Sequence, residues 1–353
     1  MHIVEVITGG EPGGAQRHVS ELVTYLVEQG HEVAVIHGGG NWLSQKLRDK
    51  ADVYYLSHLK RQISYHDIRA FRALRELIRN LRPDIVHAHS SKAGILCRLI
   101  GWQDKIPVVY TVHGFVFFDS TRSIWSRGLY RFLETWGARH SQGIITLSEA
   151  DLEFAKNAGS RGVIRKIPNG VAVRWNAPGR RLGLRRNIGF IGRFSPEKGL
   201  DVVLEAAAMT SEWRWLIAGD GDLPSKLGRR RGELENVKWL GWVDNIDQFF
   251  QNVDIVVQPS YKEGFPYAVL DAMAWGLPVV ATPVGALPEI LGQVDPHLLS
   301  AVGDAGHLIR SVRFAFDHYE SLANASYELV KARYGLEAQL RQTIETLSLV
   351  AHP

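Results

Sequence analysis

Hydrophobic positions in the first half of the chain alternate between two periods. Short β-branched runs at 3–7, 33–36 and 108–112 predict buried strands, and glycines follow the first two runs. Two further apolar runs, at 85–87 and 144–147, predict additional strands. Between the first two runs, apolar residues recur at helical spacing until Gly30, and the helix-period pattern at 68–81 stops before Pro83. This alternation of strand and helix predicts a parallel sheet with helices on both faces.

The pattern breaks at 171–186, which holds Asn176, Pro178, Gly179 and five arginines, and this composition favours a linker. Strand patterns then restart at 188–191, 215–218, 237–240, 255–257 and 279–281, and a helix is predicted at 200–208. We therefore predict an N-terminal domain at 1–170, a linker at 171–186 and a C-terminal domain at 187–335. A last helix, at about 336–353, is expected to pack back on the N-terminal domain.

The fold class predicted by these elements is α/β, with two Rossmann-like domains in tandem that face each other across a cleft. Open parallel sheets bind their ligands at the carboxyl ends of the strands. The 353 residues are too many for one typical domain and enough for two. We therefore look for chemistry in the loops that follow the strands.

The composition indicates the cellular compartment in which the protein is expected. The single cysteine, Cys97, excludes an internal disulfide and a cysteine-cluster metal site, and a reducing cytoplasm is the simplest compartment. The first ten residues lack the basic and apolar regions of a signal peptide, and no apolar run reaches the roughly 18–20 residues of a membrane-spanning helix. We expect a cytoplasmic protein, either soluble or bound at a surface.

Charge is unevenly distributed. Residues 1–179 contain 23 Lys and Arg against 16 Asp and Glu, whereas residues 180–353 contain 18 against 21. A basic half is suited to nucleic acid, an anionic membrane or a phosphorylated substrate, although charge alone favours a solvated surface.

Three loops carry candidate chemistry. Residues 9–18 hold Gly9, Gly10, Gly13 and Gly14 between a strand and a helix, where backbone amides can approach an anion. Their spacing matches neither the dinucleotide fingerprint nor a Walker A loop, so a nicotinamide cofactor is not supported. A tight turn without a ligand is the alternative.

The other two loops lie in the second half. The segment 192–199 places Arg193 and Lys198 at the start of a helix, where two cations can neutralise a diphosphate. The segment 263–282 begins with Glu263 after a strand and carries Asp271 on the following helix, with Pro266 suited to its first turn. In isolation, the arginine and lysine pair would favour a solvated basic turn, and its position at the carboxyl end of a strand shifts the balance toward function. Glu263 and Asp271 have the alternative of being surface charges.

Together, the three segments resemble family 4 of the retaining glycosyltransferases, which have the GT-B fold. The family patterns E-G-F-[GP]-x-x-x-x-E and G-R-[FL]-x-x-x-K-G occur here in order behind a glycine-rich loop, and agreement extends from Gly9 to Glu289. The resemblance implies metal-independent transfer of a hexosyl or N-acetylhexosaminyl group from a nucleotide-diphosphate sugar, with no cofactor.

The resemblance also implies residue roles. Catalytic positions are Glu263, His113, Arg193 and Lys198, and donor-binding positions are Gly13, Gly14, Arg193, Lys198, Gly219, Gly264, Phe265, Pro266 and Asp271. The family normally has Glu where this chain has Asp271, which is one methylene shorter and puts ribose binding in question. His87, His89 and His140 are interpreted as structural, and Asp220 and Asp222 as a turn rather than a metal site.

The segments 87–94 and 110–115 resemble a subgroup that builds bacterial surface polysaccharides on polyprenyl diphosphates, often from UDP-sugars. We therefore expect a lipid-linked or free saccharide acceptor. Aromatic residues and arginines mix at 115–136, and we hypothesise that this stretch docks on the anionic cytoplasmic face of the inner membrane. The candidates for acceptor or membrane contact are Arg17, Lys92, Arg122, Arg127 and Arg131.

A packed helix with arginines on its wet side is the equal alternative for this stretch. Nucleic acid is not expected, because no recognition module appears. Two other functions stay open at this point. They are a nucleotide-sugar epimerase of similar fold and a non-catalytic nucleotide-sugar-binding protein.

Overall fold

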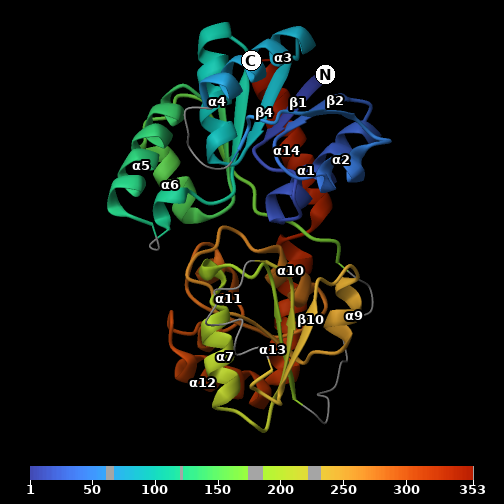
Figure 1. Cartoon of the computed structure of the whole chain (residues 1–353), viewed down its shortest axis with the longest axis vertical. Coiled ribbons are helices and arrows are strands. Elements are labelled where there is room, and N and C mark those ends of the chain that lie inside the picture. Colours follow the sequence, from blue (N-terminus) through green and yellow to red (C-terminus); the bar gives the residue numbers. More distant parts are fainter. Residues whose placement is uncertain (61–66, 120–121, 174–185, 222–231, 353) are drawn as a thin grey trace. The chain divides into compact units, whose positions relative to one another are not determined.

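The structure is a computed structural model that describes residues 1–60, 67–119, 122–173, 186–221 and 232–352 (Figure 1). The chain forms two compact units. Unit 1 comprises residues 1–118, 122–168 and 338–352, and unit 2 consists mainly of residues 169–337. Most of the predicted linker, 174–185, lies outside the described residues.

Unit 1 is built on a parallel sheet with the strand order β3-β2-β1-β4-β5-β6-β7. Its strands are β1 (His2–Ile7), β2 (Glu32–His37), β3 (Asp52–Tyr55), β4 (Ile85–His89), β5 (Val108–Val112), β6 (Gly143–Thr146) and β7 (Val163–Lys166). The strand order reverses between β1 and β4, which is where doubly wound sheets open a crevice for ligands.

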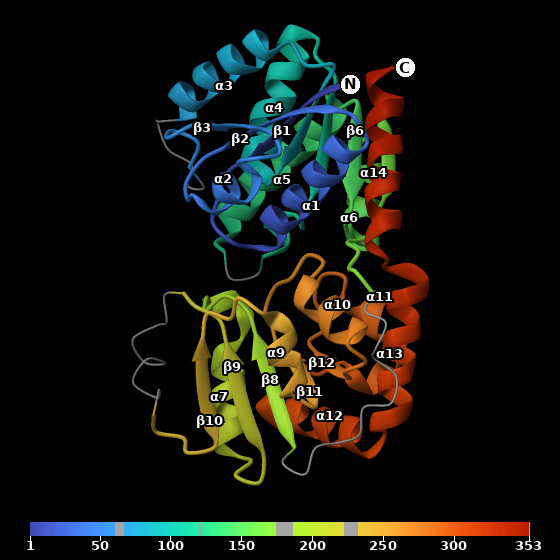
Figure 2. The same ribbon diagram turned by 90° about the vertical axis from the view of Figure 1, so that its right-hand side faces the viewer.

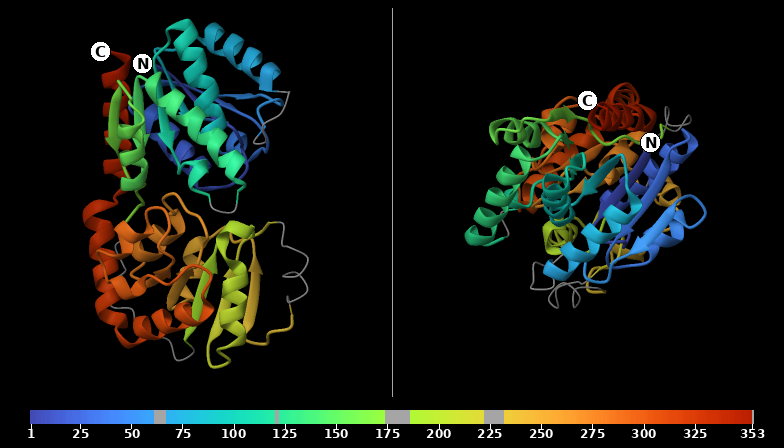
Figure 3. Two further views of the ribbon diagram at one scale, coloured as in Figure 1. Left: turned by 90° about the vertical axis from the view of Figure 1, so that its left-hand side faces the viewer. Right: turned by 90° about the horizontal axis from the view of Figure 1, so that it is seen from above.

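The helices of unit 1 are α1 (Gly14–Glu28), α2 (Trp42–Leu47), α3 (Asp67–Leu81), α4 (Ser91–Asp104), α5 (Ile124–Arg139), α6 (Glu149–Asn157) and α14 (Leu336–Ala351), with a short 3₁₀ helix η1 (Val116–Phe118). Helix α14 returns from the end of the chain and runs beside β6 (Figure 2). There, a Cβ on Gly143 would lie 3.0 Å from Val350 of α14. The N-terminus and the end of α14 lie at the same end of unit 1 (Figure 3, left).

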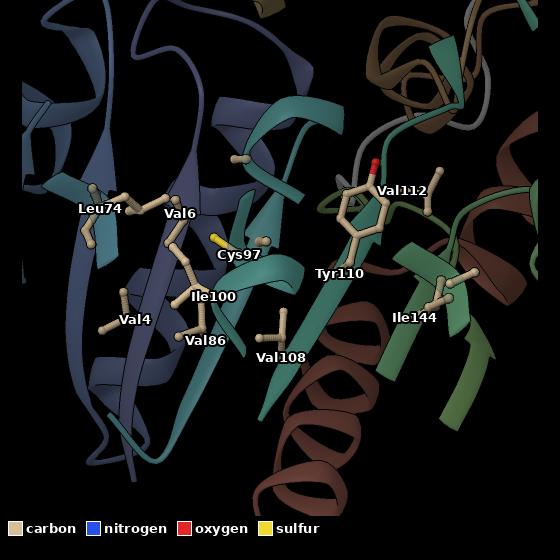
Figure 4. Close-up of a cluster of buried hydrophobic side chains, with 14 of the residues drawn as sticks. Val4, Val6, Leu74, Val86, Cys97, Ile100, Val108, Tyr110, Val112 and Ile144 are labelled. Carbon is tan, nitrogen blue, oxygen red and sulfur yellow. The ribbon is translucent and has the colours of Figure 1, made fainter. Parts of the chain in front are cut away.

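The two faces of this sheet differ in polarity. Even-numbered positions of β1 and β4, among them Val4, Val6 and Val86, belong to a buried hydrophobic cluster with α3 and α4 (Figure 4). Successive strand residues point to opposite faces, so the odd-numbered positions Glu5 and His87 share the other face. Both are fully buried. A carboxylate and an imidazole inside a sheet core require partners, and their partners identify a candidate site.

Unit 2 repeats the plan with a parallel sheet in the order β10-β9-β8-β11-β12. Its strands are β8 (Asn187–Ile191), β9 (Arg214–Ala218), β10 (Val237–Gly241), β11 (Ile255–Gln258) and β12 (Val279–Ala281). Its helices are η2 (Pro196–Lys198), α7 (Leu200–Ala208), α9 (Ile246–Gln251), α10 (Tyr267–Ala274), α11 (Leu287–Leu291), η3 (Pro296–Leu298), α12 (Ala305–Asp317) and α13 (Tyr319–Arg333). The order reverses between β8 and β11, so the loops after these two strands flank the switch point.

The predicted α/β class is confirmed, and each strand predicted from the sequence is present to within two residues at either end. The edge strands β3 and β7 of unit 1 were not predicted.

Candidate functional site

The switch point of unit 2 brings two of the predicted residues into contact. Lys198 ends η2 after β8, and Glu263 lies in the loop between β11 and α10. The Lys198 ammonium donates to Glu263 Oε1 at 2.7 Å, and the two side chains are 24% and 6% exposed. Lys198 and Glu263 belong to separate sequence motifs, and the adjacency of β8 and β11 brings them together.

The same Glu263 oxygen receives two neutral hydrogen bonds. Gln258 Nε2 donates to Oε1 at 3.0 Å and Ser260 Oγ donates at 2.7 Å. Three hydrogen bonds therefore converge on Oε1, and they fix the orientation of a carboxylate that is almost buried. Ionised carboxylates in such surroundings are stabilised by charge-assisted bonds.

Glycines allow the loops to approach this closely. Gly199 has φ +69°, and a Cβ there would lie 2.0 Å from the carbonyl oxygen of Pro259. Gly219, a predicted donor-binding residue, has φ +136° at the end of β9, and its Cβ would lie 1.9 Å from the Gly192 carbonyl oxygen. The backbone conformation and the lack of space for a Cβ atom therefore require glycine at both positions.

The remaining predicted donor residues of unit 2 surround the same switch point. Arg193 is exposed in the loop after β8, and Asp271 is partly buried on α10, as predicted. Gly264 precedes Phe265, which is buried against Tyr334 with ring centroids 5.6 Å apart. Pro266 is the residue before α10 and not part of its first turn, a shift of one position.

Unit 1 holds a second cluster, at the switch point between β1 and β4. Glu5 pairs with His87 across the two strands. His89 Nε2 lies 2.7 Å from Glu5 Oε2, and His87 Nδ1 lies 3.1 Å from the same carboxylate. His89 Nδ1 in turn lies 3.0 Å from Nε2 of His113, which follows β5. His87 Nε2 lies 2.7 Å from Thr111 Oγ1.

Burial keeps two of these imidazoles neutral. Desolvation, with the neighbouring histidines as a smaller cause, holds the pKa of His89 and of His113 well below the usual value of 6.5. His18, from the first helix, lies edge-on to His113 with ring centroids 5.0 Å apart. His113 was predicted as a site residue, whereas the connection of His89 to it was missed. The signal was present in the sequence, because Glu5 and the His87/His89 pair are polar positions within otherwise apolar strands.

Glu5, His87 and His89 also lie close enough to hold a metal ion, with ligand atoms within 4.8 Å of one another. The 2.7 Å separation between Glu5 and His89 is, however, that of a direct hydrogen bond. The cluster is thus complete as a hydrogen-bond network among the described residues. His140, interpreted as structural, has its Nδ1 2.7 Å from the Trp136 carbonyl oxygen.

The glycine-rich loop leads into α1 as predicted. Gly13 is the residue before the helix, and Gly14 is its first residue. Arg17 forms a local ion pair with Glu21 at 2.8 Å. Lys92 is buried, and its ammonium contacts Asp67 at 2.6 Å and the Lys60 carbonyl oxygen at 2.7 Å. Lys92 thus neutralises the partly buried carboxylate of Asp67, and its role toward an acceptor or a membrane stays a prediction.

The aromatic and basic stretch forms α5, whose two sides differ. Tyr130 and Glu134 are buried, whereas Trp125, Leu129 and Phe132 are 87%, 49% and 68% exposed. Their spacing of four and three residues places these three on one side of the helix. The alternative of aromatics packed inside and arginines outside is therefore wrong for this side of α5.

The arginines near α5 differ in their surroundings. Arg122 and Arg131 are exposed, and the guanidinium of Arg122 lies 5.8 Å from the Tyr130 ring centroid. Arg127 is partly buried and donates to the Phe117 carbonyl oxygen at 2.9 Å, so it also supports η1. No helix within the described part of the chain combines the length and apolarity needed to cross a membrane.

Comparison with known proteins identifies a family model for each half of the chain. The family model described as Glycosyltransferase Family 4 matches residues 12–175, and the one described as Glycosyl transferases group 1 matches residues 185–318. The chain is 31% identical over 294 residues to UDP-Gal:alpha-D-GlcNAc-diphosphoundecaprenol alpha-1,3-galactosyltransferase of Escherichia coli, a match that covers 76% of both chains.

Solved structures share the fold over nearly the whole chain. Anabaena HepE in complex with UDP and glucose has a TM-score of 0.81 at 20% identity, covering 99% of this chain and 100% of that one. Sucrose-phosphate synthase from Thermosynechococcus elongatus has a TM-score of 0.81 at 19% identity, covering 99% and 98%. The fold is thus GT-B, and the chain belongs to glycosyltransferase family 4 and is a glycosyltransferase.

Proposed function

We propose that this enzyme transfers a glycosyl group from a UDP-sugar to a saccharide carried on a polyprenyl diphosphate, with retained anomeric configuration and without a metal ion. The observation that carries the proposal is the 31% identity to an Escherichia coli enzyme whose name states both a UDP-sugar donor and a diphosphoundecaprenol-linked acceptor. The complex of HepE with UDP and glucose supports the same class of donor.

Unit 2 supplies the groups for the donor. Arg193 and Lys198 provide two positive charges after β8, enough to balance the charge that develops on a departing UDP. Because three donors already hold Glu263 Oε1, we assign its Oε2 to the hydroxyl groups of the donor sugar. Asp271, at the position of the usual family acid, is assigned to the ribose.

The reaction balances with these groups alone. The bond between the anomeric carbon and the β-phosphate oxygen breaks, and its electron pair leaves with UDP. An acceptor hydroxyl oxygen bonds to the anomeric carbon on the same face, and its proton passes to the departing phosphate oxygen. Lys198 and Arg193 stabilise that phosphate through charge-assisted hydrogen bonds.

The acceptor would be reached at a membrane surface. Trp125, Leu129 and Phe132 form an exposed apolar face on α5, flanked by the exposed Arg122 and Arg131. Aromatic side chains with neighbouring cations are suited to the interface of an anionic bilayer. We therefore place the enzyme at the cytoplasmic face of the inner membrane, where α5 contacts the lipid.

Flotation with anionic liposomes tests this surface. Trp125→Ser should abolish most co-flotation, whereas Trp242→Ser, which removes a 55% exposed tryptophan from unit 2, should not. Equal flotation of the two variants would contradict a membrane role for α5.

The donor assignment is tested by thermal stabilisation with UDP, GDP and ADP, each with and without EDTA. We expect stabilisation by UDP that EDTA does not alter and that Arg193→Ala removes. Stabilisation that requires a divalent ion would contradict the metal-free site, and stabilisation by another nucleotide alone would contradict the choice of UDP.

A further inference from the structure

A continuous hydrogen-bonded chain runs through unit 1 from Glu5 through His89 to His113. Glu5 and His89 are fully buried, and His113 is partly exposed. The two contacts are 2.7 Å and 3.0 Å long. We refer to these three side chains as the relay.

The chemistry of the relay determines where each proton lies. An ionised carboxylate only accepts hydrogen bonds, so His89 must donate from Nε2 and His87 from Nδ1. Because desolvation holds the pKa of His89 well below 6.5, its Nδ1 carries no proton and accepts from His113. His113 therefore carries its proton on Nε2. Its pKa is also held well below 6.5 by burial, so Nδ1 of His113 has a free lone pair to accept a hydrogen bond.

The groups packed around the relay are compatible with this assignment. Thr111 Oγ1 donates to His87 Nε2, which is an acceptor once Nδ1 donates to Glu5. His18 approaches His113 edge-on, and the side-chain amide of Gln339 on α14 donates to His18 Nδ1 at 2.9 Å. The charged and titratable neighbours of His113 are thus Glu5, His87, His89 and His18.

We propose that Glu5 and His89 are positioning residues that hold His113 in the tautomer protonated at Nε2, so that its Nδ1 accepts a hydrogen bond from a hydroxyl of a sugar substrate. The sugar contact rests on the proposed function, whereas the tautomer follows from unit 1 alone. The same logic operates wherever a buried carboxylate orients an imidazole through one ring nitrogen and leaves the other for substrate.

The tautomer can be measured directly. Two-bond ¹H–¹⁵N correlation spectra of histidine-labelled protein at pH 7.5, assigned by loss of signals in His113→Gln, distinguish a proton on Nε2 from one on Nδ1. We expect neutral His113 protonated at Nε2. Protonation at Nδ1, or at both nitrogens, would overturn the proposal.

Two substitutions that nearly preserve side-chain volume distinguish an effect of the relay from a general effect on core packing. Glu5→Leu removes the carboxylate that accepts a hydrogen bond from His89 Nε2. A buried N–H group without an acceptor is unfavourable, so the proton of His89 should leave Nε2. His89 should then protonate at Nδ1 and donate to His113, whose own proton moves to Nδ1. Thr111→Val alters the same buried face but leaves Glu5 in place, so the proton on His113 should stay on Nε2.

Activity provides the second readout. With a UDP-sugar donor, Glu5→Leu should lower kcat/KM by about tenfold while UDP affinity is unchanged, since the diphosphate groups belong to unit 2. An unaltered His113 tautomer in Glu5→Leu would sink the relay, even if that variant were less active. If the unmodified enzyme used no UDP-sugar, the proposed function would fail, and the spectra would still decide the relay.

Discussion

Gly199 offers the sharpest structural test of the donor site, because an alanine there should separate Lys198 from Glu263. The added Cβ would lie 2.0 Å from the Pro259 carbonyl oxygen and 2.7 Å from its carbonyl carbon, and backbone atoms cannot rotate away. Relief requires a shift of at least about 1 Å between the two loops. The Lys198 to Glu263 bond, now 2.7 Å, would lengthen or break.

The chain contains a matched control. Gly241 has the same φ of +69°, yet nothing lies within 4 Å of a Cβ built there. Alanine at either position incurs the left-handed penalty of about 1–2 kcal/mol. Only Gly199→Ala adds the clash, which for overpacked sites costs a further ~1–3 kcal/mol. The difference between the two variants therefore isolates the loop contact.

Urea unfolding followed by tryptophan fluorescence, and UDP titration by calorimetry, measure both consequences. We expect Gly199→Ala to be the less stable variant. We also expect it to bind UDP about 10- to 150-fold more weakly, the equivalent of one lost charge-assisted hydrogen bond. Gly241→Ala should bind UDP as the unmodified enzyme does. If the two variants matched in stability and UDP affinity, the account of the loop contact would be refuted.

Three further outcomes follow from the described contacts. Glu134→Gln should destabilise unit 1 by about 3–5 kcal/mol in urea unfolding, because it removes the carboxylate charge that faces the Arg98 guanidinium at 2.6 Å. Both side chains are at most 1% exposed, and a loss of stability below about 1 kcal/mol would contradict this expectation. Lys198→Met should weaken UDP binding in calorimetry at least tenfold, which is roughly the loss of one charge-assisted hydrogen bond. Lys238→Met, which changes an exposed residue of β10, should leave UDP binding unaltered, and equal effects of the two substitutions would argue against the site. His89 and His113 stay neutral in the folded state because burial holds their pKa values well below 6.5, but both protonate near pH 6.5 when the chain unfolds. The free energy of unfolding should therefore fall as the pH drops below 6.5, by at most about 1.4 kcal/mol per pH unit for each histidine. A flat stability profile from pH 7 to 5 would contradict their burial.

Sequence patterns predicted the buried strands well because their apolar runs reflect burial on both faces. The edge strands β3 and β7 escaped prediction because all four residues of each are partly buried or exposed, so neither shows a clear apolar run. Chain length and the alternation of strand and helix patterns did predict two α/β units, and the ordered motifs predicted the family.

Contacts between distant segments were harder to predict. Glu5 and His87 are 82 residues apart and meet only through the register of β1 and β4, which no local pattern encodes. Lys198 and Glu263 are 65 residues apart and meet because β8 and β11 are neighbours. The residue types were therefore readable from the sequence, but their partners depended on strand order.

The most direct test of the account is a transfer assay with the purified chain, a panel of UDP-sugars and N-acetylglucosaminyl diphosphate-polyprenol in anionic liposomes. We expect one UDP to be released for each sugar added to the lipid-linked acceptor. The anomeric configuration of the donor should be retained in the product by NMR, and EDTA should not change the rate. Inverted configuration, dependence on a divalent ion, or UDP release without a glycosylated product would contradict it.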